Sequence, residues 1–254
     1  MSNTKIDEIF PKNRPVVFFH AHCDDESFLS AGLLNELSRK KRKCVAIYGA
    51  AASVKGEEKT IIRQQQTIEA CSILGISSVI FLKYSEPKYQ GTNVFPLMNQ
   101  KIEDVGNELL EALGKNNIKL PISLVSYDKN GGYGNKDHKV IHLVGRHLKN
   151  KYPEQIFLSE ITINRDAMSN WLAGAKKRLN PDLIPQLEYW SKEFGLLNKE
   201  IEYSYKLTET QLVLKRKALA FHNFYNKPNL FPLALNDLDF KQVFGTEYLH
   251  LPTV

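Results

Sequence analysis

The sequence contains little cysteine and no extended apolar run. Its three cysteines, Cys23, Cys44 and Cys71, are odd in number and lack paired spacing, which argues against a disulfide framework. The first residues, from Met1 to Lys5, are polar and contain no apolar signal core, and no stretch is long enough to span a bilayer. These absences predict a soluble, cytoplasmic protein without a transmembrane segment, in a compartment that keeps thiols reduced.

Charge of one sign is not concentrated either. The formal net charge is +6, and the basic residues are spread widely along the chain. The one compact basic run, residues 39–43, lies between an expected helix end and an expected strand start. Positive charge there complements the negative end of the helix dipole. We therefore do not predict a nucleic-acid partner from this run.

The composition is that of an ordinary globular protein, with 43% hydrophobic and 24% charged residues in a chain of 254. The sequence contains neither internal repeats nor low-complexity segments. This length suits one large α/β domain, so we expect a single domain over residues 1–254. The composition is compatible with a homo-oligomer.

Strand-like and helix-like segments alternate in the first half of the chain. We predict strands at residues 16–19, 44–48, 79–82, 122–125 and 155–160, and helices at residues 27–40, 57–74, 97–113 and 137–149. This order predicts a Rossmann-like α/β fold, with a mostly parallel sheet and helices on both faces. The second half is less regular. We expect a helical excursion over residues 166–200, then a strand at 202–207 and a helix at 208–225.

Three adjacent carboxylates follow the first predicted strand, in the run His22-Cys23-Asp24-Asp25-Glu26. Such groups repel one another, and burying them is costly unless a cation lies among them. A divalent metal is the obvious cation, with His22 and Asp25 as ligands. Asp24 would then be free to move a proton, although it could also cap the following helix. We expect Cys23 to be a small buried filler.

A second unusual segment, residues 126–138, follows the fourth predicted strand. It is rich in turns, and three of its residues, Gly131, Gly132 and Gly134, are glycines that let the backbone approach another group closely. His138 would lie in the first turn of the next helix, with Asp137 placed to orient it or a neighbour. Ligands of parallel sheets bind at the carboxyl ends of the strands. The two segments are therefore expected at the same edge of the sheet.

Two histidines and one aspartate, His22, Asp25 and His138, have the composition of a catalytic zinc site with open positions. Zinc would lower the pKa of a bound water to about 7 and polarise a carbonyl oxygen. Asp24, adjacent to Asp25, could take the proton of that water and pass it to a leaving amine. This composition predicts hydrolysis of an amide or ester.

The chain resembles the PIG-L/LmbE-like zinc N-deacetylases. Their opening motif, Ala-His-Pro-Asp-Asp-Glu, is similar to residues 21–26, and their second motif, Gly-Gly-Tyr-Gly-His-Pro-Asp-His, is similar to residues 131–138. A weaker third match is the segment 217–222. The resemblance implies that His22, Asp25 and His138 bind Zn²⁺ or another divalent metal and that Asp24 is the general base. It places Tyr133 where it contacts the substrate or the oxyanion.

The resemblance also implies a substrate. It is a small N-acylated amino sugar, from which the enzyme removes an acetyl or other acyl group at the amine of an N-acetylglucosamine-type conjugate. Two alternatives remain open: an amidase acting on a non-sugar or larger N-acyl substrate, and a zinc-retaining binding protein without turnover.

The sequence departs from the family motifs at two positions. Cys23 replaces a proline, and Asn135 replaces a histidine that in relatives helps to hold the oxyanion. Asparagine donates a hydrogen bond but transfers no proton at neutral pH. Our hypothesis is that Asn135 and Tyr133 help the metal to hold the oxyanion, and that Asp24 performs both proton transfers.

Several further residues have two readings. His142 follows His138 at the i,i+4 spacing, and we expect it to support the site or the fold. His222 could either pack its helix or line the pocket. Lys55 and Arg63 could meet an anionic group of the substrate or lie on a solvated helix surface.

Overall fold

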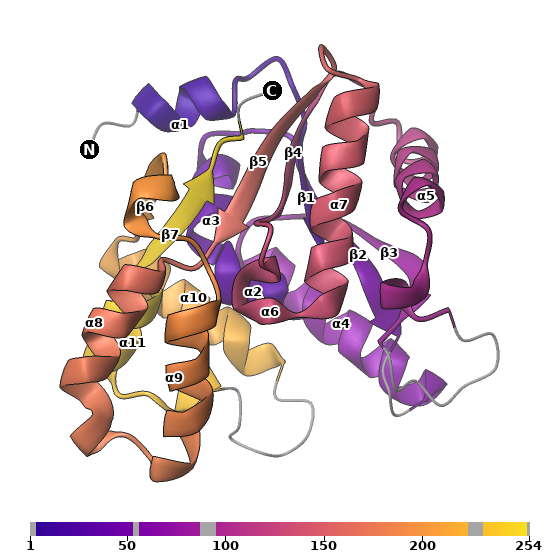
Figure 1. Ribbon diagram of the computed structural model, residues 1–254. Coiled ribbons are helices and arrows are strands. Elements are labelled where there is room, and N and C mark those ends of the chain that lie inside the picture. The colour runs from indigo at the N-terminus through magenta and orange to yellow at the C-terminus, as the bar shows by residue number, and fades with distance from the viewer. Residues whose placement is uncertain (1–3, 53–55, 87–94, 223–230, 253–254) are drawn as a thin grey trace.

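The computed structural model describes residues 4–52, 56–86, 95–222 and 231–252. Within them, the core is a seven-stranded sheet in the order β3-β2-β1-β4-β5-β7-β6 (Figure 1). The strands are β1 (Val16–His20), β2 (Cys44–Ala52), β3 (Ser78–Ser85), β4 (Ile122–Tyr127), β5 (Ile156–Thr162), β6 (Tyr203–Lys206) and β7 (Thr246–His250).

Strands β1 to β5 are parallel, whereas β7 runs antiparallel to both β5 and β6. Phe18 of β1 lies opposite Ala46 of β2 on one side and Val125 of β4 on the other. Every residue of β1 and β4 is buried. Such continuously buried strands are expected where helices cover both faces of a sheet. The predicted α/β fold with a mostly parallel sheet is confirmed.

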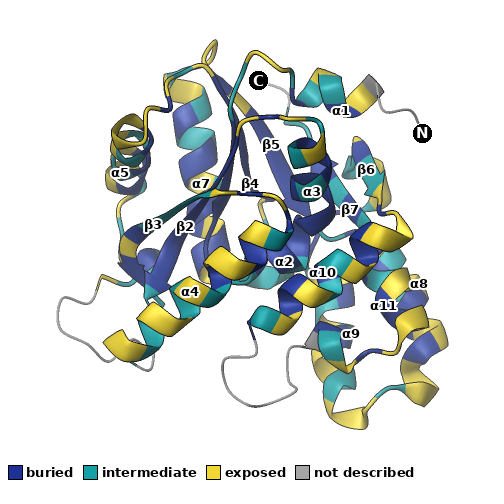
Figure 2. Ribbon diagram, turned by 180° about the vertical axis from the view of Figure 1, so that it is seen from behind, coloured by how far each residue is buried: buried dark blue, intermediate teal, exposed yellow. Residues whose placement is uncertain are grey.

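Helices cover the sheet on two sides. Figure 1 shows α5 (Ile102–Lys115) and α7 (Lys136–Lys151) on one face, and Figure 2 shows α3 (Ala31–Arg39), α4 (Glu57–Ile73) and α10 (Glu209–Phe221) on the other, with their buried sides turned inward. The remaining helices are α1 (Thr4–Ile9), α2 (Asp25–Leu29), α6 (Gly131–Gly134), α8 (Arg165–Ala175), α9 (Ile184–Glu193) and α11 (Asp237–Phe244).

The structure differs from the prediction in the region of residues 27–40. Instead of one helix, α2 and α3 meet at Ser30. The amides of Gly32 and Leu33 donate to the two carboxylate oxygens of Glu247, at 2.9 and 2.8 Å. These donors form the first turn of a new helix, so Glu247 from β7 fixes where α3 begins.

Other boundaries shift less. A 3₁₀ turn, Leu97–Asn99, precedes α5, which begins only at Ile102. Thr208 caps α10 through a reciprocal pair of bonds with Gln211. The predicted continuation of that helix to residue 225 extends beyond the described residues. Both α11 and β7 were absent from the sequence prediction.

The predicted helical excursion consists of α8, α9 and short 3₁₀ turns. It packs with α11 around a hydrophobic cluster of its own, which includes Met168, Trp171, Leu187 and Phe240. The indole of Trp171 donates to Asp239 Oδ1 at 2.8 Å, whereas Tyr189 is 58% exposed. The excursion lies below the carboxyl ends of the strands in Figure 1, beside α6.

Strands β1 and β4 are neighbours in the sheet. The chain continues from β1 towards β2 on one side and from β4 towards β5 on the other. Ligand sites in open α/β sheets form at this kind of switch point, outside the carboxyl ends of the strands. Both segments singled out in the sequence begin there.

Candidate active site

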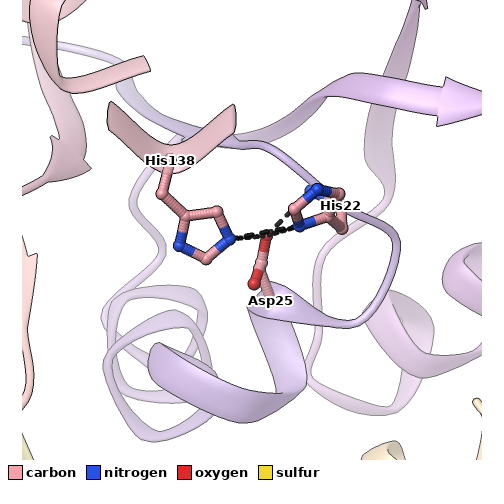
Figure 3. A group of neighbouring side chains, drawn as sticks. All are labelled: His22, Asp25 and His138. Atoms are coloured by element: carbon pink, nitrogen blue, oxygen red, sulfur yellow. Dashed lines mark hydrogen bonds and ion pairs between the residues drawn. The ribbon is translucent and has the colours of Figure 1, made fainter. Parts of the chain in front are cut away.

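Three buried side chains meet at the switch point (Figure 3). His22 lies in the turn after β1, Asp25 is the first residue of α2, and His138 is in the first turn of α7. The Nδ1 atom of His22 is 3.1 Å from Nε2 of His138. The Oδ2 atom of Asp25 is 3.3 Å from that Nε2 and 3.5 Å from that Nδ1. The structure thus brings together the three residues selected from the sequence.

The triangle formed by these three atoms fits a metal ion. Zinc bonds of about 2.0–2.1 Å in a tetrahedral arrangement place neighbouring ligand atoms roughly 3.3 Å apart. The observed separations of 3.1, 3.3 and 3.5 Å bracket that value. Two imidazoles and one carboxylate also leave a fourth position open. The donor set therefore suits a zinc-like catalytic metal.

Asp137 orients His22. Its Oδ2 atom lies 3.0 Å from Nε2 of His22, and the Nδ1 atom of His22 faces His138 and Asp25. Burial alone would lower the pKa of His22, but hydrogen bonds with Asp137 and Asp25 raise it to about 10. A carboxylate on the remote nitrogen of a ligand histidine fixes its tautomer and increases its basicity. A metal would bind His22 by displacing a proton from Nδ1.

Tyr127 orients Asp25. The hydroxyl of Tyr127 donates to Oδ2 of Asp25 at 2.7 Å, and the backbone N–H of His22 donates to the same oxygen at 2.8 Å. The ring of Tyr127 also stacks on His138, with centroids 3.9 Å apart. Burial would raise the pKa of Asp25, but His138 and His22 hold it well below its usual value. Sequence reasoning missed Tyr127, although its position at the carboxyl end of β4 was an available signal.

Asp24 lies beside the cluster without joining it. It is the N-cap residue of α2, but its side chain makes no capping hydrogen bond. Burial and the charge of Asp25 raise its pKa, whereas Arg63 and His222 act in the opposite direction. Arg63, on α4, forms an ion pair with Glu86 and has a side chain only 12% exposed. Lys55 lies outside the described residues.

The glycine-rich segment brings Tyr133 against the cluster. Its ring meets His138 edge-on at 4.9 Å and lies 5.2 Å from Trp190 of α9. Burial and the charges of Asp25 and Asp24 raise the pKa of Tyr133 well above its usual value. The hydroxyl therefore remains protonated and able to donate.

Asn135 has a structural role that the sequence did not reveal. It is the N-cap of α7, and its Oδ1 accepts from the backbone N–H of Asp137 at 2.8 Å. Because the oxygen is engaged in the cap, the Nδ2 amide is the part of the side chain that can donate to a substrate.

The remaining candidates are not part of the triangle of His22, Asp25 and His138. His142 Nδ1 lies 3.0 Å from the carbonyl oxygen of Tyr127 and 3.1 Å from Glu160, so it supports β4 and β5. Cys23 is 1% exposed, and burial raises the pKa of its thiol to about 12. His222 is buried and bonds to Glu26 at 2.6 Å.

A family model supplies the decisive comparison. The model described as GlcNAc-PI de-N-acetylase, PIG-L, matches residues 17–149. The chain belongs to the PIG-L family. This match covers more than half of the sequence and includes both segments that form the site. A search of curated proteins finds no match to this PIG-L chain.

Solved structures share the fold at low identity. The zinc-inhibited form of teicoplanin deacetylase has a TM-score of 0.61 and 10% identity, over 92% of this chain and 97% of the other. For N,N'-diacetylchitobiose deacetylase from Pyrococcus horikoshii the TM-score is 0.52 and the identity 17%, over 91% and 74%. A 4-carboxy-2-hydroxymuconate hydratase from Pseudomonas putida scores 0.51 at 13% identity, over 95% and 98%. Since one fold carries different reactions, function must be argued from the site.

A bilayer-spanning helix would have to be long and apolar, and the described part of this PIG-L chain contains none.

Proposed function

We propose that this PIG-L chain is a zinc-dependent hydrolase that removes an acetyl group from the amine of an N-acetylglucosamine-type sugar conjugate. The main support is the group of His22, Asp25 and His138, whose ligand atoms are separated by the distances expected in a tetrahedral zinc site. Asp24 lies beside this group and is not part of the ligand set. Two further observations support the substrate class. The family model is that of a GlcNAc-PI de-N-acetylase, and the similar structures include deacetylases of teicoplanin and of N,N'-diacetylchitobiose.

The residues divide the work of amide hydrolysis. Zinc held by His22, Asp25 and His138 would lower the pKa of a water to about 7 and polarise the amide carbonyl. Asp24 accepts the proton of the attacking water as its oxygen bonds to the carbonyl carbon. The same carboxyl then gives that proton to the amine nitrogen as the carbon–nitrogen bond breaks, releasing acetate and a free amine.

In this proposal two donors hold the oxygen on which negative charge develops. The Nδ2 amide of Asn135 is free of the cap that occupies its Oδ1, and the Tyr133 hydroxyl stays protonated. Hydrogen bonds to that oxygen are worth most in the transition state. Because Asn135 supplies no proton, Asp24 performs both transfers in this proposal.

The test is release of acetate and amine from a panel of N-acetylated amino sugars, with Asp24→Asn compared with the wild type. We expect the substitution to reduce kcat by about 10²–10⁴-fold and to leave bound zinc unchanged. Asp182→Asn, at an exposed position on the excursion, is the matched control. Removing zinc with a chelator should abolish turnover, and adding zinc should restore it. Full activity of the Asp24 variant, or of the metal-free protein, contradicts the proposal.

The same panel separates the alternatives. The second candidate is a binding protein without turnover. It is favoured by Asn135, because the oxygen of this side chain is engaged in a helix cap and the side chain transfers no proton. That candidate predicts sugar binding at full zinc occupancy with no amine released. Longer N-acyl chains and non-sugar amides in the panel identify an amidase of different specificity.

A further inference from the structure

Helix α2 contains Asp25 and begins directly after Asp24, yet its intrinsic stability is low. It has only five residues, Asp25–Leu29, whereas isolated helices shorter than about 12 residues are marginal in water. Its N-cap side chain makes no capping hydrogen bond. The direction of its first turn, and so the position of the Asp24 carboxylate, must be set by contacts with other elements.

Glu26 provides such contacts. This carboxylate is fully buried. Its Oε1 lies 2.6 Å from Nε2 of His222, at the end of α10, and accepts from Ser27 Oγ at 2.5 Å. Its Oε2 accepts from the hydroxyl of Tyr48, on β2, at 3.0 Å. The Glu26 carboxylate, in the first turn of α2, therefore connects this helix to β2 and to the end of α10.

The contact between Glu26 and His222 is short and lies entirely in the interior. The nitrogen and oxygen atoms are 2.6 Å apart, and the side chains of His222 and Glu26 are only 3% and 0% exposed. Hydrogen bonds between charged partners are about twice as strong as neutral ones, and removing one partner leaves a buried charge unpaired.

We propose that His222 is a positioning residue that fixes the first turn of α2 through Glu26, and thereby holds Asp24 beside the metal ligands. Tyr48 and Ser27 contact the same carboxylate, but Ser27 belongs to α2 itself. Tyr48 is shared with Cys71, whose sulfur lies 3.2 Å from its hydroxyl. His222 thus ties α2 to α10 through Glu26, and the hydroxyl of Ser27 lies 3.3 Å from the same Nε2. The inference rests on the proposed function for its catalytic meaning.

The first experiment measures the backbone directly and needs no turnover. Hydrogen exchange of the amides of Ser27 and Phe28, which donate to the Asp24 carbonyl oxygen, is compared in the wild type and in His222→Ala, with and without zinc. We expect exchange to be about tenfold faster, or more, in the variant, since a buried charged hydrogen bond is lost. His250→Ala is the matched control, because His250 pairs with Glu202 on the antiparallel edge.

The second experiment measures catalysis. His222→Ala should lower kcat by about 10–100-fold, the scale of a small misplacement of a catalytic group, while KM, zinc content and the fraction of folded protein stay near wild type. His222→Gln, whose amide can still donate to Glu26, should recover part of kcat and serves if the alanine variant folds poorly. Glu26→Gln combined with His222→Ala should be no worse than the more damaging single substitution.

The outcomes are distinct. The positioning role would be overturned by any of three results. These are unchanged hydrogen exchange in α2, additive effects of the Glu26 and His222 substitutions on kcat, and a loss of activity equal to the loss of folded protein. If the wild type releases no amine from any substrate, the proposed function fails instead. The exchange measurement still decides whether His222 holds α2.

Discussion

The two segments that build the site are held in place in different ways. The carboxylate segment, residues 22–26, is fixed by side chains of the central sheet and of α10, such as Tyr127 on Asp25 and Tyr48 on Glu26. The glycine segment, residues 131–138, is fixed largely by backbone contacts with the helical excursion. His22 and Asp25 thus depend on the sheet and on the end of α10, whereas Tyr133 and Asn135 depend on a part of the chain far away in sequence.

The turn after α9 forms the brace of the glycine segment. The N–H of Gly195 donates to the carbonyl of Gly132 at 2.7 Å, and the side-chain Nδ2 of Asn130 donates to the carbonyl of Gly195 at 2.8 Å. Arg165 donates to the same carbonyl and to that of Phe194, at 2.9 and 2.8 Å. The excursion therefore shapes the loop that presents Tyr133 and Asn135, besides lying at the rim of the site.

The largest effect should come from breaking the carboxylate segment at the metal. Asp25→Ala removes one of the three proposed ligand atoms and leaves the buried Tyr127 hydroxyl without its acceptor. We expect zinc content to fall far below one ion per chain and turnover to reach the level of the chelated protein. Metal analysis and the amine-release assay measure this, with Asp182→Ala as the control. Retention of a full complement of zinc would show that Asp25 is not a ligand.

Next in size is the loss of a donor from the glycine segment. Asn135→Ser keeps an oxygen that can cap α7 but removes the Nδ2 amide. If that amide holds the developing oxyanion, kcat should fall by on the order of a hundredfold, with zinc content and melting temperature unchanged. Asn135→His, the residue of the family motif, exchanges the cap for a proton donor, and a gain in kcat would mean that the asparagine limits this enzyme.

The contact between the glycine segment and the turn after α9 can be tested at Gly134. This residue has a φ of +88°, and an added methyl group would lie 2.2 Å from the Phe194 ring. We expect Gly134→Ala to retain zinc but to lower kcat by roughly tenfold or more, because the loop must shift away from the excursion. Adding Phe194→Ala should relieve the steric part and leave the backbone strain. Gly114→Ala, where nothing lies within 4 Å of the added carbon, is the matched control. Loss of zinc in Gly134→Ala would contradict the expectation that His138, at the start of α7, keeps its place when the loop before it shifts.

The smallest effect is expected at the thiols. Burial raises the pKa of Cys23 and of Cys44 to about 12, and it raises that of Cys71 further. Because the thiolate is the reactive form, a disulfide reagent at neutral pH should label none of them in the folded protein and all three after unfolding. Cys23→Ala should leave kcat within about twofold of wild type, since the removed group is a small apolar filler. Rapid labelling of Cys23 would show that the carboxylate segment opens.

The contrast between the segments also explains what the sequence could predict. The apolar runs of β1, β2 and β4 and the residue types of the two motifs are local signals, and they located the sheet and the triangle of His22, Asp25 and His138. Contacts between distant residues carry no such signal. The break at Ser30 depends on Glu247, and the role of His222 depends on Glu26, about 200 residues away.

The C-terminal elements were missed for a related reason. Strand β7 alternates between buried and half-buried residues and contains charged and polar side chains. Its partners are β5 and β6, so its stability comes from a place in the sheet that no local pattern describes. Asn135 stands directly before α7, and asparagine is a favoured N-cap residue, so its cap function had a local signal in the sequence.

The strand order β5-β7-β6 has a consequence for the order in which parts of the chain fold during synthesis. In the described residues β6 pairs with β7 alone, and β7 is the later strand in the sequence. During synthesis the parallel strands can form first, since domains fold as their residues emerge. β6 must wait for residues 246–250, and so must the Glu247 bonds that start α3. A chain halted before Thr246 should therefore keep a parallel core but expose β6 and the junction of α2 and α3 at Ser30 to limited proteolysis. Equal resistance of these two sites in the halted and full chains would refute this order.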